Sequence, residues 1–140
     1  MIWRCAVPSQ PRTRSVSRAQ VRSYAGKAQE YLEAAEASLA DGRYIAATSL
    51  AVHAGISAGD AICGARTGRR SADQDHARAV ALLGDAGPEG KAAARHLGRL
   101  LPLKTRAEYE PDDVPKSIAT KAVRAATEIV AIAQRVVATS

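Results

Sequence analysis

Residues 44–65 read YIAATSLAVHAGISAGDAICGA, and this segment constrains the fold more than any other part of the chain. Ala, Gly and Ser recur throughout the segment, and no proline interrupts it. Small side chains let neighbouring helices approach closely, so the segment is predicted to form a central helix with other helices packed around it. Gly55 and Gly59 each cost about 1 kcal/mol relative to Ala inside a helix. Close packing has to offset that cost.

Amphipathic helices are predicted on both sides of this segment. Before it, apolar residues recur at steps of three and four from Ala19 to the DGR turn at 41–43, where Gly42 is a plausible left-handed cap. After it, residues 118–136 show the most regular alternation of four and three. No segment has the pattern of a strand. The prediction is an all-α, up-and-down bundle of four long helices plus one short helix.

The ends of the later helices carry recognisable signals. Ser71 or Asp73 is expected to cap a third helix that runs to about Leu83. Pro88 suits the first position of a fourth helix. The stretch LPLKTRAEYEPDD contains two prolines and is predicted to be a loop, after which Asp113 caps the last helix.

The charge is unevenly distributed along the chain. The net charge is +6, but residues 1–22 hold five arginines and no acid, leaving 15 basic against 14 acidic residues elsewhere. Residues 1–19 are therefore predicted to be a disordered basic tail, in the manner of a bacterial extension, and residues 20–140 to be a nearly neutral folded domain. A broad basic surface for nucleic acid is not expected on that domain. Two cysteines, Cys5 and Cys63, indicate no disulfide framework, and no segment is predicted to be a signal peptide or a membrane span.

The stretch RRSADQDH, residues 69–76, is the main candidate for chemistry. A loop that reverses direction before a helix can bring the guanidinium of Arg69 or Arg70 to the imidazole of His76. A histidine can move a proton at a ribose 2′-hydroxyl or at the leaving oxygen, and an arginine can stabilise charge on the phosphate. The alternative is a solvated loop in which Asp75 caps the following helix.

Two further groups of polar residues are candidates either for substrate contacts or for a structural polar network. His53 and Asp60 lie seven residues apart, on one face of the central helix. Lys104, Arg106 and Tyr109 fall in the predicted loop after the fourth helix, where two cations stand beside a phenol. No spacing of histidines or cysteines predicts a metal site, and no motif predicts a cofactor.

The order of these motifs resembles the HEPN superfamily, named for a nucleotide-binding domain of higher eukaryotes and prokaryotes. LADGRYIAATSLAVHAGISAGDAI, then GRRSADQDHARAVALL, then LLPLKTRAEY follow the pattern of small stand-alone bacterial members over roughly residues 20–137. The resemblance implies a helical bundle that is usually a homodimer. Many members are metal-independent RNases of toxin–antitoxin, CRISPR-linked or phage-defence systems, with an Arg, four to six residues, and then a His. Arg69 or Arg70 before His76 satisfies that spacing.

Two functions follow from this resemblance. The first is a cytoplasmic endoribonuclease with His76 as general acid/base and Arg70 or Arg69 as phosphate clamp, although in the RNase members the motif lies near the last helix. The second is a non-catalytic dimeric module that docks on a nucleotidyltransferase-like protein or another toxin–antitoxin component. The first predicts Arg70 and His76 exposed in a cleft. The second predicts a buried His76, bonded to Asp60 or Tyr109 in an internal network.

Overall fold

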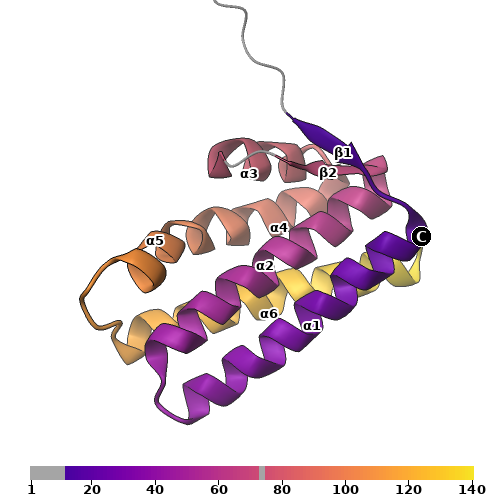
Figure 1. Ribbon diagram of the computed structural model, residues 1–140. Coiled ribbons are helices and arrows are strands. Elements are labelled where there is room, and N and C mark those ends of the chain that lie inside the picture. The colour runs from indigo at the N-terminus through magenta and orange to yellow at the C-terminus, as the bar shows by residue number, and fades with distance from the viewer. Residues whose placement is uncertain (1–11, 73–74) are drawn as a thin grey trace, which may run out of the picture.

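Within residues 12–72 and 75–140, which the computed structural model describes, the chain forms six helices and one two-stranded sheet (Figure 1). The long helices lie side by side, which confirms the all-helical bundle. The short strands and α3 lie together at one end of it. The elements in chain order are β1 (Thr13–Ser15), α1 (Arg18–Ala40), α2 (Tyr44–Thr67), β2 (Arg69–Ser71), α3 (His76–Gly84), α4 (Gly87–Leu100), α5 (Pro102–Tyr109) and α6 (Lys116–Ala138).

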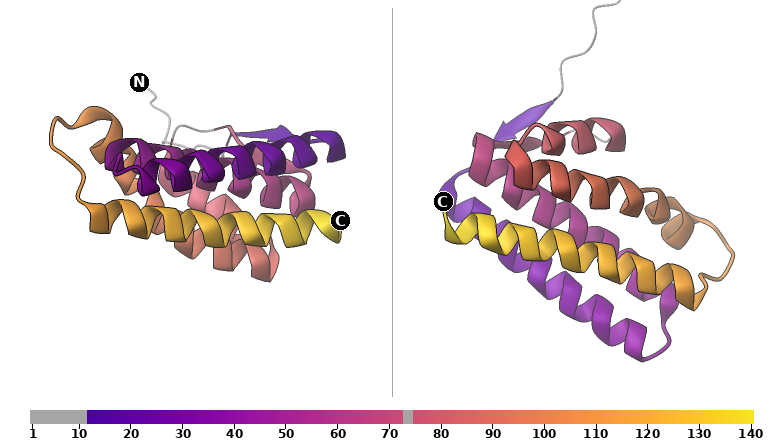
Figure 2. Two further views of the ribbon diagram at one scale, coloured as in Figure 1. Left: turned by 90° about the horizontal axis from the view of Figure 1, so that it is seen from below. Right: turned by 180° about the vertical axis from the view of Figure 1, so that it is seen from behind.

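Helix α2 occupies the centre of the bundle, as its small residues predict. Thirteen of its 24 residues are buried, against four of 23 in α1, because α1, α4 and α6 all pack on it. A Cβ atom at Gly55 would come within 2.5 Å of the Leu100 side chain and 3.3 Å of Ile129. Gly55 therefore lets α4 and α6 approach α2 directly. Seen from behind, α6 runs between α4 and α1 (Figure 2).

The hydrophobic core consists mainly of alanine and branched aliphatic side chains. Its largest fully buried side chains include Ile62, Leu83, Leu100 and Ile129. Among the helices in the described part of the chain, only α2 is long and apolar enough to cross a membrane by length and composition. Because 61% of that apolar window is buried in the bundle, α2 serves here as the core helix.

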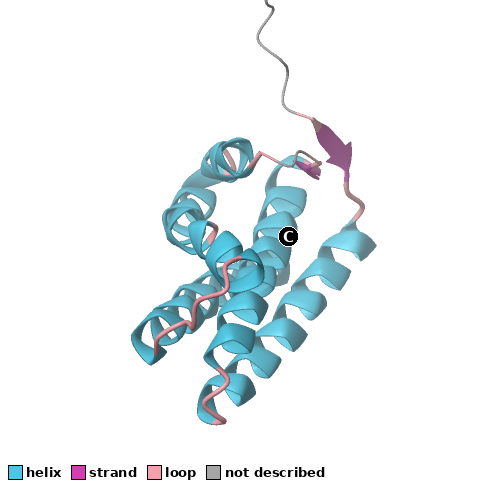
Figure 3. Ribbon diagram, turned by 60° about the vertical axis from the view of Figure 1, so that its left-hand side comes forward, coloured by secondary structure: helices cyan, strands magenta, loops and turns pink. Residues whose placement is uncertain are grey.

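The two strands form an antiparallel ribbon that the sequence does not predict. Thr13 pairs with Ser71, Arg14 with Arg70, and Ser15 with Arg69. The predictions of no strand and of disorder up to residue 19 are therefore wrong from residue 13 onwards, and β1 leads directly into α1 (Figure 3). Residues 1–11, which include Cys5, lie outside the described part of the chain.

Some predicted helix ends are confirmed and others are wrong. Gly42 has a φ of 74° just after α1, as expected, and Pro88 lies in the first turn of α4, one residue after its first position at Gly87. Helix α3 is capped by Asp75 rather than by Ser71, which belongs to β2. The other predicted cap for α3, Asp73, lies outside the described residues.

The segment between α4 and α6 differs most from expectation. Residues 102–109 form helix α5 instead of a loop, because Pro102 stands in the first helical turn, where a backbone N–H is not needed. Helix α6 then begins with Pro115 at its N-cap, two residues later than the predicted cap at Asp113. The bundle therefore has two short helices, α3 and α5, rather than one.

Replacing Ser17 by Ala is expected to lower the free energy of unfolding by about 1 kcal/mol. Ser17 Oγ accepts a hydrogen bond from the Gln20 amide at 3.1 Å, and Gln20 Oε1 accepts one from the Ser17 amide at 2.9 Å. This capping box satisfies two amides that α1 itself cannot pair. Urea unfolding measures the loss. Ser23→Ala, which removes an exposed hydroxyl within the same helix, should change stability less. An equal loss in both variants would contradict the capping role.

Candidate functional site

A pocket of about 190 Å³ lies between α2, α3 and the junction of α4 with α5. Four ionisable side chains line it, Asp60 and Cys63 from α2, His76 from α3 and Lys104 from α5, together with Ser71 from β2. The wall between them is largely apolar. The fold thus brings a carboxyl, an imidazole and an ammonium group to one cavity from three separate helices. Its volume is below the roughly 300 Å³ at which pockets for drug-sized ligands begin, which suits a phosphate and a sugar better than a whole nucleotide.

The cap of α3 fixes His76 at the pocket. Asp75 Oδ1 accepts hydrogen bonds from the amides of Ala77 at 2.9 Å and Arg78 at 3.4 Å. His76 is the first residue of α3 and is exposed, while it also lines the pocket. The prediction that Asp75 caps this helix is confirmed. His76 is therefore not the buried histidine that the alternative predicts, whereas Arg70, which the catalytic hypothesis expects to be exposed, is half-buried.

The environment of Asp60 changes its chemistry. Burial raises the pKa of Asp60 from 3.8 to about 6, against the opposing effect of the positive charges of Arg70 and Lys27. A carboxyl group in this range can both release and accept a proton near neutral pH. The neighbouring Cys63 behaves differently, because burial, and then the Asp60 charge, raise the pKa of its thiol to about 12. The thiol therefore stays protonated at neutral pH.

The two candidate arginines point to different partners. Arg70 is half-buried, its guanidinium carbon lies 5.6 Å from the centre of the Tyr24 ring, and it donates to the Ser71 carbonyl at 2.9 Å. Arg69 is exposed and donates from Nε to Thr13 Oγ1 at 2.6 Å. The spacing in RRSADQDH is compatible with either arginine at the site. The arginine whose charge acts on the pKa of Asp60 is Arg70.

His53 pairs with Glu108 rather than with Asp60, which corrects the predicted pairing within α2. His53 Nε2 lies 3.1 Å from Glu108 Oε1, and its ring stacks on Tyr31 with the two ring centres 5.4 Å apart. Ser49 Oγ also donates to Glu108 Oε1, at 3.0 Å. This cluster joins α1, α2 and α5, so the polar network at His53 is separate from the pocket residues.

Helix α5 carries residues of both clusters. Lys104 and Glu108 are four positions apart and therefore lie on the same side of the helix. Lys104 lines the pocket, and Glu108 pairs with His53. Glu108 is not among the predicted site residues because the segment 102–109 is predicted to be a loop, although the four-residue spacing from Lys104 to Glu108 is present in the sequence. Arg106 is half-buried and Tyr109 is 74% exposed, and neither lines the pocket.

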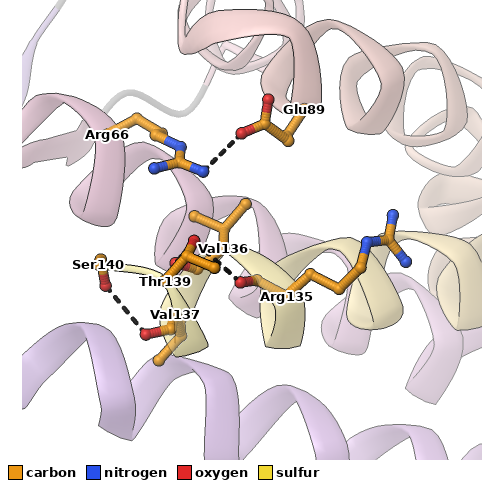
Figure 4. A network of polar contacts seen from close by, with 7 residues as sticks. All are labelled: Arg66, Glu89, Arg135, Val136, Val137, Thr139 and Ser140. Atoms are coloured by element: carbon orange, nitrogen blue, oxygen red, sulfur yellow. Dashed lines mark hydrogen bonds and ion pairs between the residues drawn. The ribbon is translucent and has the colours of Figure 1, made fainter.

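A third polar group joins α2 to α4 away from the pocket (Figure 4). Arg66 Nη2 lies 2.5 Å from Glu89 Oε1, and the side chain of Arg135 extends from α6 nearby. The pKa of the Glu89 carboxyl is lowered by a hydrogen bond from its own backbone and by Arg66. Arg66 is thus paired with an acid, and its role is structural.

Among residues 12–72 and 75–140, no three His, Cys, Asp or Glu side chains gather in a group that could hold a metal ion. Cys63 is a free, buried cysteine.

The stability of the protein is expected to depend on pH through Asp60. The pKa of Asp60 is about 6 in the folded state, which therefore keeps this proton up to about pH 6, whereas the unfolded state releases it near the ordinary pKa of 3.8. Raising the pH between these values therefore lowers the free energy of unfolding. Asp60→Asn removes this pH-dependent contribution. The free energy of unfolding of the variant should therefore rise relative to that of the wild type by about 1–3 kcal/mol between about pH 4 and pH 7. Urea unfolding at several pH values measures the difference.

Glu89→Gln is the matched control for this prediction, because its shift has the opposite sign. The pKa of Glu89 is lowered, so its contribution is present at neutral pH and is lost as the pH falls. Glu89→Gln should therefore lose stability relative to the wild type as the pH rises. If the wild-type and Asp60→Asn curves run parallel over this range, Asp60 does not titrate as described.

These features define the class of protein: it is a helical bundle that carries a small polar pocket and a two-stranded ribbon at one end. The sequence matches the model of the HEPN domain family over residues 21–136, most of its length. The chain therefore belongs to the HEPN domain family, which indicates a nucleotide- or RNA-related role at the level of the family. A search of curated proteins found no match to it.

Proposed function

We propose that this HEPN-domain protein is a metal-independent endoribonuclease whose active site is the pocket formed by Asp60, His76 and Lys104. The observation that carries this proposal is their convergence from three helices on one cavity beside Arg70. RNA cleavage through the ribose 2′-hydroxyl needs a proton acceptor, a proton donor and a positive charge at the phosphate. The pocket offers all three. A cytoplasmic toxin–antitoxin or phage-defence system is the proposed setting.

The proposed reaction is an internal transesterification. His76, at the mouth of the pocket, takes the proton from the 2′-hydroxyl as its oxygen attacks the adjacent phosphorus. The bond from phosphorus to the 5′-oxygen breaks, and protonated Asp60 gives its proton to that oxygen. A carboxyl group whose pKa is raised by burial suits the role of general acid. Lys104 and Arg70 stabilise the negative charge that builds up on the phosphate.

The test uses a short RNA that the protein cleaves in the presence of EDTA. A single 2′-deoxynucleotide at the cleaved position removes the attacking oxygen and should abolish cleavage there while other positions remain sensitive. The 5′ product should end in a 2′,3′-cyclic phosphate, which phosphatase leaves intact and acid opens. Cleavage at the deoxynucleotide, or a product that ends in a free 3′-hydroxyl, would show that water is the nucleophile and that the proposal is wrong.

The second candidate is a non-catalytic homodimeric module that docks on a partner protein. It is favoured by two large apolar side chains that are exposed, Ile45 at 44% and Tyr109 at 74%. Ile45 lines a surface hollow together with Ala107 and Val114, away from the pocket. If this surface joins two chains, Ile45→Glu should convert a dimer to a monomer by light scattering. An inactive wild type with an intact dimer would favour this module.

A further inference from the structure

The β1–β2 ribbon places two arginines directly opposite each other. Arg14 pairs with Arg70 across the antiparallel strands. Side chains at opposed positions lie about 4.5–5.5 Å apart at Cβ, where like charges destabilise the pairing. The ribbon itself, residues 13–15 and 69–71, contains Arg14, Arg69 and Arg70 and no acid. The ribbon therefore concentrates positive charge in a geometry that an anion would stabilise.

The charges of the ribbon remain available. Arg70 donates to a backbone carbonyl and lies over the Tyr24 ring, and Arg69 donates to Thr13, so their hydrogen bonds go to neutral groups, while Arg70 also acts electrostatically on Asp60. Arg14 is exposed. Arg66 is different, because Glu89 pairs with it. The ribbon arginines thus differ from the structural arginine at the end of α2.

The ribbon is continuous with the pocket. Ser71, the last residue of β2, lines the pocket, and its cross-strand partner is Thr13. The next pair along the ribbon is Arg14 with Arg70, and Arg70 is the arginine that acts on Asp60. Because successive side chains of a strand point to opposite faces, Arg14 and Arg70 share the face opposite to Thr13 and Ser71, and Arg70 links that face to the pocket through its effect on Asp60.

We propose that the β1–β2 ribbon binds the backbone of single-stranded RNA next to the sugar and phosphate held in the pocket, with Arg14 and Arg70 sharing a phosphate that flanks the cleaved one. This inference rests on the proposed function, since it extends the same site to a longer substrate. Two guanidinium groups on one face can each donate to phosphate oxygens. The Arg70 guanidinium lies over the ring of the half-buried Tyr24, which holds it in place. The substrate class is therefore an RNA strand of several nucleotides rather than a free nucleotide.

The experiment measures the binding of a labelled single-stranded RNA of about twelve nucleotides, a typical length for such grooves, over a series of salt concentrations. His76→Ala serves as the background so that the RNA stays intact. Adding Arg14→Gln should weaken binding about 3–10-fold and reduce the slope of log K against log salt by about 0.7, the value for one phosphate contact on a single strand. Arg124→Gln, an exposed arginine of α6, is the matched control and should leave both quantities near the parent values.

Two further measurements separate this inference from the proposed function. Arg14→Gln in the wild-type background should leave the cleavage of a dinucleotide unchanged, because that substrate has no flanking phosphate. Circular dichroism should show that the variant stays folded, since it removes a repulsion. Equal RNA affinity and equal salt slope in parent and Arg14→Gln would overturn the ribbon proposal while leaving the pocket chemistry standing. Weaker binding without any cleavage by the wild type would support the ribbon and overturn the nuclease. No RNA binding by the parent would overturn both.

Discussion

His76→Ala is expected to slow RNA cleavage in EDTA by about 10²–10⁴-fold, the usual contribution of a general acid or base. The imidazole is the group at the pocket mouth that can take the 2′-hydroxyl proton, and Ala cannot replace it. Because His76 is exposed and Asp75 still caps α3, the free energy of unfolding should change by no more than about 0.5 kcal/mol. Rate constants under single-turnover conditions, with all proteins purified identically, measure the effect.

His96→Ala is the matched control for this variant. His96 is half-buried and lines a different hollow, between α4 and α6, so its loss should leave the cleavage rate at the wild-type value. Activity that survives His76→Ala, or that falls equally in both variants, would remove His76 from the mechanism. RRSADQDH would then be a capping loop, as the structural alternative holds.

Gly90→Ala is expected to destabilise the fold by about 2–3 kcal/mol, even though Ala gains about 1 kcal/mol over Gly as a helix former. A Cβ atom at Gly90 would overlap the backbone oxygen of Leu83 and would lie 2.8 Å from the Ala86 Cβ. A backbone atom cannot rotate out of the way, so α4 would have to move relative to α3. Denaturant unfolding measures the loss.

Gly26→Ala provides the opposite case in the same protein. A Cβ at Gly26, an exposed position of α1, would meet no heavy atom within 4 Å. The substitution should therefore stabilise the protein by about 0.5–1 kcal/mol through helix propensity alone. Changes of the same sign in the two variants would contradict the close approach at Gly90. Since α3 also carries His76, Gly90→Ala should reduce RNA cleavage as well.

The sequence predicts the bundle because its helices follow a local rule. The apolar spacing of α6 has to face the core, and the small residues of α2 have to be surrounded on all sides. The same rule fails for α5, because Pro102 looks like a helix breaker in the sequence and is in fact a helix starter. It fails for β1 and β2 too, since three-residue strands are too short to show a period.

The site is only partly visible in the sequence for a related reason. His76 and Arg70 are close in the chain, so their spacing suggests a common site. Asp60 and Lys104 join His76 only through the packing of α2, α3 and α5, which no local pattern records. The elevated pKa of Asp60 likewise depends on burial by distant segments. The predicted partner of His53 was wrong because two residues on one helix face do not have to touch.

The ribbon also determines the order in which the molecule can assemble. The contact between Arg69 and Thr13 spans 56 residues, and two complete helices separate the strands. Closing that loop costs conformational entropy, and the hydrogen bonds of three residue pairs offset only part of it. The hairpin of α1 and α2 brings the strand ends together first. The two strands therefore pair after α1 and α2 have packed against each other. Arg14 and Arg70 therefore come to face each other only after the hairpin of α1 and α2 has formed.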